Sequence, residues 1–180
     1  LCFVLSGASK VLALPQLMPA WIVVVGAPAW REHALARLEF LADAYLSVSP
    51  LIAHVLPSLF EARTAIQAEL AQRVAINRAC LAAALKPIDG VELLPAEAGW
   101  AAIVRATDAG AEDEEAFALA LLERRGVLVH PGFFFDLEPR DLAGRCAHWV
   151  VGLLLEPSAF AAGVEAFANE WMELRSARSS

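Results

Sequence analysis

The stretch LSGASKVLALPQL, residues 5–17, decides how this sequence is interpreted. The apolar residues 2–5 run into a serine and a glycine, which predicts a short buried strand followed by a loop. Lys10 lies in that loop, and the apolar residues 11–14 follow it. A lysine amine in apolar surroundings is more often neutral, and therefore nucleophilic, than one in water. The pattern leaves two interpretations open: an imine-forming lysine, or a loop lysine whose charge lies in water.

Two hydroxyls flank this lysine. Ser6 and Ser9 belong to the same loop, and hydroxyls and exposed backbone N–H groups are typical ligands of a phosphate. The loop therefore has candidate groups for an aldehyde, at Lys10, and for a phosphate, at the two serines.

The remaining pattern predicts an α/β layer followed by a smaller α+β domain. A second buried strand is expected at residues 21–25 and a helix at residues 30–46. Pro57 is expected to break the chain before a long helix, residues 58–85, with Ser58 as its N-cap. The domain boundary is accordingly placed at residue 57, giving domains 1–57 and 58–180.

The second domain alternates short apolar runs with helical periodicity. Gly126 is expected to end the first helix, and Pro157 to begin the last one. The acidic run at residues 112–115 is expected to form a solvated helix start. Strands are predicted at residues 91–94, 101–105, 127–129 and 149–155, and helices at residues 112–125 and from residue 157 onward.

Composition excludes several classes of protein. Hydrophobic residues make up 58% of the 180 residues, which excludes a disordered chain. The net charge of −7 argues against a nucleic-acid partner. The longest apolar run is far shorter than the ~20 residues of a membrane span. Three dispersed cysteines and four histidines without metal-ligand spacing predict no metal site and a reducing, cytoplasmic location.

Two motifs together carry a family resemblance. Residues 5–17, followed by WIVV at residues 21–24, resemble the Schiff-base lysine segment of class I/II aminotransferases, which are pyridoxal-phosphate enzymes of fold type I. GVLVHPG, residues 126–132, resembles a second motif of the same family. The resemblance covers nearly the whole chain. It implies the C-terminal part of the large cofactor-binding domain, followed by the small C-terminal domain.

The resemblance also implies an activity. Lys10 would hold pyridoxal 5′-phosphate as a Schiff base and then act as general base and acid. Ser6 and Ser9 would contact the cofactor phosphate. The reaction would transfer an amino group between an amino acid and a 2-oxo acid, and the full-length protein would be a homodimer. The chain is expected to be incomplete, because it begins just before the lysine.

The sequence departs from the family at two basic positions. Met18 stands where the family has a cation for the cofactor phosphate, and Val150 stands where many relatives bind the substrate carboxylate with an arginine. Arg140 or Arg145 is a candidate replacement for that arginine, and His130 is a candidate substrate-pocket residue. These departures keep an alternative open: a non-catalytic domain of the same fold, either a regulatory effector-binding half or a degenerate fragment.

Three consecutive phenylalanines, Phe133, Phe134 and Phe135, follow the second motif. They are expected either to line the mouth of an active site or to fill the core.

Overall fold

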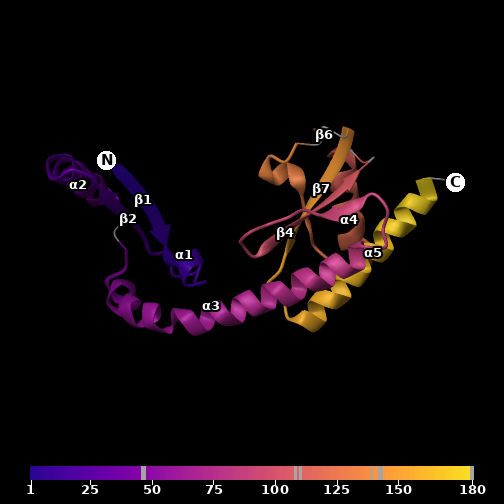
Figure 1. Ribbon diagram of the computed structural model, residues 1–180, viewed down its shortest axis with the longest axis horizontal. Coiled ribbons are helices and arrows are strands. Elements are labelled where there is room, and N and C mark those ends of the chain that lie inside the picture. The colour runs from indigo at the N-terminus through magenta and orange to yellow at the C-terminus, as the bar shows by residue number, and fades with distance from the viewer. Residues whose placement is uncertain (46–47, 108, 110, 139, 142–143, 179–180) are drawn as a thin grey trace. The chain divides into compact units, whose positions relative to one another are not determined.

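The computed structural model describes residues 1–45, 48–107, 109, 111–138, 140–141 and 144–178. The chain forms two compact units, Leu1–Glu69 and Leu70–Ser180 (Figure 1). The division between them falls inside one long helix, whereas the sequence places the domain boundary at residue 57.

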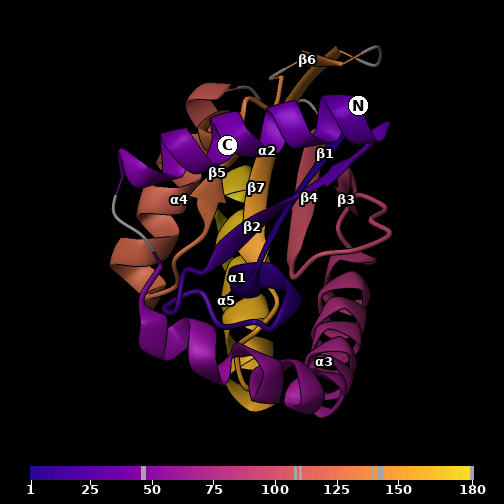
Figure 2. The same ribbon diagram turned by 90° about the vertical axis from the view of Figure 1, so that its left-hand side faces the viewer.

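The first unit is built on a two-stranded antiparallel sheet. β1 (Cys2–Gly7) pairs with β2 (Ala20–Val25) along its full length (Figure 2). The one-turn helix α1 (Ala8–Val11) follows β1, and α2 (Pro28–Asp43) follows β2. Both strands were predicted, but the prediction that they are buried is wrong, since most of their apolar side chains are exposed. Within the described residues each strand has only the other as a ladder partner, so a two-stranded sheet leaves its faces in water.

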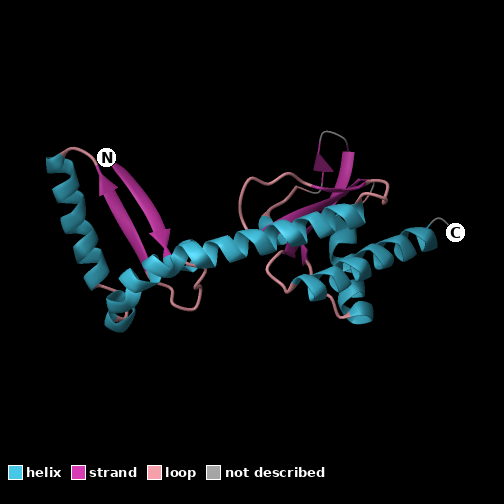
Figure 3. Ribbon diagram, turned by 60° about the horizontal axis from the view of Figure 1, so that its bottom comes forward, coloured by secondary structure: helices cyan, strands magenta, loops and turns pink. Residues whose placement is uncertain are grey.

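The long helix α3 spans Pro50–Leu85, and Pro57 lies in its interior. Figure 3 draws the helices of the chain in cyan. The predicted break at this proline and the predicted N-cap at Ser58 are therefore wrong. Proline removes one backbone donor from a helix, and Pro57 is exposed, so the carbonyl that loses its partner can bind water. Among the helices that the structure describes, none combines the length and apolarity needed to cross a membrane.

The second unit contains an antiparallel sheet with the strand order β3-β4-β7-β5, and β6 also pairs with β7. The strands are β3 (Val91–Leu93), β4 (Ala101–Thr107), β5 (His130–Pro131), β6 (Arg140–Asp141) and β7 (Gly144–Gly152). The predicted strand at residues 127–129 lies outside these ladders. Gly126, at a φ of 67°, ends the preceding helix as expected, and the N–H of Val127 still bonds to the carbonyl of Leu121. The backbone after Gly126 thus keeps one hydrogen bond to the helix, and it first pairs with the sheet at His130.

The 3₁₀ helix η1 (Gly132–Phe135) follows β5. Its three phenylalanines, Phe133, Phe134 and Phe135, are exposed, so the interpretation that these rings fill the core is wrong. The other interpretation, that they line the mouth of an active site, stays a prediction.

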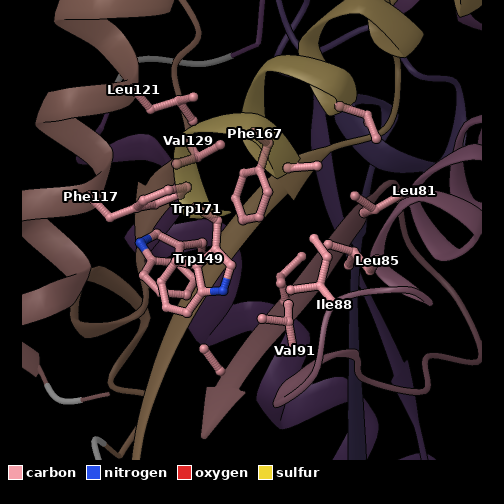
Figure 4. Packing of buried hydrophobic residues seen from close by; sticks show 14 of the residues in the cluster. Leu81, Leu85, Ile88, Val91, Phe117, Leu121, Val129, Trp149, Phe167 and Trp171 are labelled. Carbon is pink, nitrogen blue, oxygen red and sulfur yellow. The ribbon is translucent and has the colours of Figure 1, made fainter. Parts of the chain in front are cut away.

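The helices α4 (Ala111–Arg125) and α5 (Pro157–Arg178) join the end of α3 on one face of this sheet. Figure 4 shows the aromatic centre of the resulting core, where Phe117 lies 4.9 Å from Trp149 and 5.4 Å from Trp171, ring centre to ring centre. The rings meet edge to face, a favourable arrangement. α5 begins at Pro157 as predicted, and apolar residues at helical spacing along it, Phe160, Val164, Phe167 and Trp171, are buried.

A buried carboxylate on α5 also forms hydrogen-bonded ion pairs with two arginines of α4. Glu170 on α5 is fully buried and accepts hydrogen bonds from Arg124, at 3.2 Å, and Arg125, at 3.0 Å. The hydrogen bond to Glu170, together with a second one to Glu173, raises the pKa of Arg125 above its ordinary value. Each buried oxygen of Glu170 therefore faces a cation, which offsets the cost of removing the charge from water.

Candidate functional site

Lys10 lies on α1, directly after β1. The turn is held by two backbone hydrogen bonds of 2.9 Å, from Ala8 to the carbonyl of Pro19 and from Leu12 to the carbonyl of Ala8. Ala8 and Leu12 are fully buried, and they lie on one side of the turn because they are four residues apart. Lys10, midway between them, is on the opposite side and is exposed.

The apolar surroundings expected for Lys10 are therefore not found. The neighbouring apolar residue Leu12 turns inward, so the described residues leave the lysine accessible to solvent. Ser9 precedes it on α1, Ser6 lies near the end of β1, and both are half-buried. The amine and the two hydroxyls thus belong to one short strand–helix junction.

Residues distant in the sequence hold this junction in place. Gln67 on α3 donates a hydrogen bond of 2.8 Å to the carbonyl of Val11, at the end of α1. Gly7 packs closely against the returning loop, since an added Cβ would lie 3.0 Å from the carbonyl oxygen of Pro19, a tight contact. Neither contact was predicted. For the close packing at Gly7, the only local signal was the glycine itself, directly after Ser6. The hydrogen bond from Gln67 joins residues 56 positions apart, and such a contact leaves no local pattern.

The junction has the groups that a pyridoxal phosphate requires at its aldehyde, and only part of those required at its phosphate. The Lys10 amine fits the aldehyde, and the Ser6 and Ser9 hydroxyls fit phosphate oxygens. Met18, in the loop that returns to β2, is exposed and has a φ of 52°. Its thioether supplies neither charge nor a donor to an anion.

His130 and Val150 are brought together in the second unit. They are cross-strand partners in the β5–β7 ladder, with His130 exposed and Val150 buried. The structure therefore places the candidate substrate residue beside the position at which relatives are expected to carry arginine.

The two candidate arginines lie elsewhere on the same sheet. Arg140 and Arg145 are partners in the β6–β7 ladder, and Arg145 is exposed. The side chain of Arg140 lies outside the described part of the structure. Arg145 precedes Val150 by five residues on β7, a distance of roughly 17 Å at ~3.4 Å per residue. Their role as carboxylate ligands stays a prediction.

Sequence reasoning missed Glu114. The prediction that residues 112–115 form a solvated face is wrong at Asp113 and at Glu114, since both are buried, and Glu114 is fully buried. Its carboxylate accepts hydrogen bonds from the backbone N–H of His148, at 2.7 Å, and of Phe133, at 2.9 Å. Glu114 lies three residues before Phe117 and seven before Leu121, so it shares the buried face of α4. That spacing was the available signal.

The comparisons place the fold among known proteins. No protein-family model and no curated protein matches the chain. Solved structures do match it along nearly its whole length, each being a longer protein.

A PLP-dependent aminotransferase from Streptococcus suis superimposes with a TM-score of 0.68 at 19% identity, over 95% of this chain and 42% of its own. An aminotransferase from Mycobacterium tuberculosis superimposes with a TM-score of 0.66 at 21% identity, over 93% of this chain and 41% of its own. An aromatic aminotransferase from Pyrococcus horikoshii superimposes with a TM-score of 0.68 at 16% identity, over 96% of this chain and 43% of its own. The chain thus has an aminotransferase-like fold and spans less than half the length of these proteins.

Proposed function

We propose that this chain forms the lysine-bearing segment and the C-terminal part of a pyridoxal-phosphate-dependent aminotransferase, with Lys10 as the covalent anchor of the cofactor. The observation that carries the proposal is the position of Lys10. The lysine of the family-like motif is the third residue of α1, the short helix that follows β1, in a chain whose fold resembles aminotransferases over 93–96% of its length.

Each group at the junction has a distinct role in this proposal. The cofactor, when bound, supplies the electron sink that makes amino-group transfer possible. Lys10 attaches it through its Nζ atom and, once released, moves a proton at that same atom. Ser6 and Ser9 donate hydrogen bonds to phosphate oxygens, and the buried Ala8 and Leu12 orient the short helix that carries the lysine.

The non-catalytic alternative is favoured by three observations. Lys10 is exposed rather than in the apolar surroundings expected of an imine-forming lysine. Met18 is exposed at the position expected to hold a phosphate-binding cation, and Val150 is buried at the position expected to hold the carboxylate-binding arginine. A bidentate guanidinium contact has no substitute in a valine side chain. In that case the fold would be retained while the chemistry was lost.

Covalent labelling separates the two proposals. The chain contains two lysines, Lys10 and Lys86, and both are exposed. After incubation with limiting pyridoxal 5′-phosphate, reduction with borohydride and peptide mapping, the aminotransferase proposal predicts at least 10-fold more label on Lys10. Lys86 serves as an internal control with the same chemistry and similar exposure.

Three further variants and one analogue sharpen the test. Lys10→Arg should abolish the preferential label, whereas Lys86→Arg should leave it unchanged. Pyridoxal without its phosphate, or the double variant Ser6→Ala/Ser9→Ala with the phosphorylated form, should each reduce the preference for Lys10. Equal labelling of the two lysines would overturn the proposed anchor and favour the non-catalytic alternative.

A further inference from the structure

One face of α3 contacts the Lys10 junction at two points within the first unit. Phe60 on α3 packs on Trp21 of β2, with the ring centres 5.7 Å apart, and Trp21 is the ladder partner of Ser6. Gln67, seven residues further along α3, donates its hydrogen bond to the carbonyl of Val11. Residues seven positions apart lie on the same face of a helix. The packing of Phe60 therefore orients the face from which Gln67 reaches α1.

The helix that carries Lys10 needs support from outside. α1 has only four residues, and a single helical turn is marginal in water because fixing its backbone costs more than its few hydrogen bonds return. The last carbonyls of a helix also have no partner within it. The carbonyl of Lys10 accepts the N–H of Ala13 at 3.4 Å, which is long, whereas Gln67 binds the carbonyl of the next residue, Val11, at 2.8 Å. The side chain of Gln67 is thus the firmer contact at this end of α1.

We propose that Gln67 is a positioning residue for Lys10. By binding the carbonyl of Val11 it holds α1 as a helical turn, and the turn determines where the Lys10 amine stands relative to the Ser6 and Ser9 hydroxyls. Gln67 binds backbone, so it acts through α1 and takes no part in the chemistry itself. The effect on cofactor attachment rests on the proposed function, whereas the effect on α1 does not.

Three variants test the hydrogen bond. Gln67→Glu keeps the length of the side chain, but its carboxylate has no N–H to donate, and Gln67→Arg restores N–H donors. Gln72→Glu is the matched control, because Gln72 is exposed on the same helix and the change in charge is identical.

The first measurement needs no cofactor. The N–H of Leu12 donates to the carbonyl of Ala8, so its hydrogen exchange, followed by NMR, reports whether α1 is formed. Exchange at Leu12 should be at least 5-fold faster in Gln67→Glu. It should stay close to that of the parent chain in Gln67→Arg and in Gln72→Glu.

The second measurement is the ratio of label on Lys10 to label on Lys86, after pyridoxal 5′-phosphate and borohydride, at several pH values. Gln67→Glu should lower the ratio at least 5-fold across the pH profile, and Gln67→Arg should recover it. The urea midpoint should be the same in all these chains, since a general loss of folding would lower it and would not single out Lys10.

The remaining outcomes overturn the inference in different ways. Unchanged exchange at Leu12 in Gln67→Glu would show that Gln67 does not hold α1. Faster exchange with an unchanged label ratio would show that Gln67 holds α1 without positioning Lys10, and would leave the proposed anchor intact. Equal label on Lys10 and Lys86 in the parent chain would instead overturn the proposed function, and the positioning role with it.

Discussion

At the scale of single residues, Glu114 is a fully buried carboxyl group at the centre of several hydrogen bonds in the second unit. Each of its carboxylate oxygens accepts one backbone N–H, from His148 and from Phe133, and its own carbonyl accepts Trp149 Nε1 at 3.0 Å. The Glu114 side chain therefore links α4 by hydrogen bonds to the start of η1 and to the middle of β7.

Replacing Glu114 by glutamine tests this role. Glutamine keeps the shape of the side chain, but its NH₂ group must face one of the two N–H donors, which leaves a buried donor without a partner. We expect Glu114→Gln to lower the free energy of unfolding by about 1–3 kcal/mol. Urea denaturation followed by the near-ultraviolet circular dichroism of the buried tryptophans measures the change.

Glu115 provides the matched control, because it is the next residue of α4 and is exposed. Glu115→Gln should change the stability by no more than about 0.5 kcal/mol. Hydrogen exchange gives a second readout, in which the amides of Phe133 and His148 exchange faster in Glu114→Gln alone. Equal stabilities of the two variants would contradict the assigned role of Glu114.

At the scale of elements, the packing of η1 on β7 depends on the absence of a side chain at Gly132. A Cβ there would lie 2.6 Å from the Cβ of His148 and 3.1 Å from an oxygen of Glu114. The nearest atoms belong to a buried strand, so the turn has to move away. Gly132→Ala should destabilise the second unit by about 1–3 kcal/mol, and it should shift the amide signals of residues 133–136.

Gly152, at the C-terminal end of β7, is the control, since an added Cβ would meet nothing within 4 Å. Gly152→Ala should be neutral or stabilise the chain by up to about 1 kcal/mol, because alanine restricts the unfolded chain more than glycine does. A thermal melt that ranks Gly132→Ala as the more stable variant would contradict this account of the turn.

The elements also show what the sequence could reveal. α5 was predicted from Pro157 and from an apolar stripe that runs from Phe160 to Leu174, because apolar residues on one face of a helix repeat every 3.6 residues. The continuation of α3 through Pro57 was not predicted, because an exposed proline can be accommodated by water at the carbonyl it leaves unpaired. Local pattern cannot distinguish these two outcomes for a proline.

The candidate site was predictable to the same limited degree. The motif around Lys10 located the junction, and an exposed lysine was one of the two interpretations left open. Periodicity in so short a segment did not predict the one-turn helix or the burial of Leu12. Gln67 and Glu114 act through contacts with residues far along the chain. Such contacts follow from the fold, so they became visible only with the structure.

At the scale of the whole molecule, the two units differ in how they bury apolar residues. The second unit has a continuous core around Trp149, whereas in the first unit both strands and α2 leave large apolar side chains exposed. Exposed apolar patches of this kind favour association. The homodimer implied by the family resemblance stays a proposal, and the first unit is the part of the chain to which we assign the contact.

Self-association tests that assignment. We expect the mean molar mass, measured by light scattering after size-exclusion chromatography, to rise above 19.3 kDa as the concentration increases. Val23→Lys places a charge on the exposed apolar strand β2, and it should shift the transition to at least 10-fold higher concentration. Ala65→Lys adds the same charge at an exposed position of α3 and should have little effect, which controls for net charge. If the chain remains a monomer at every concentration, or if both lysine variants behave alike, the apolar surface of the first unit does not drive association.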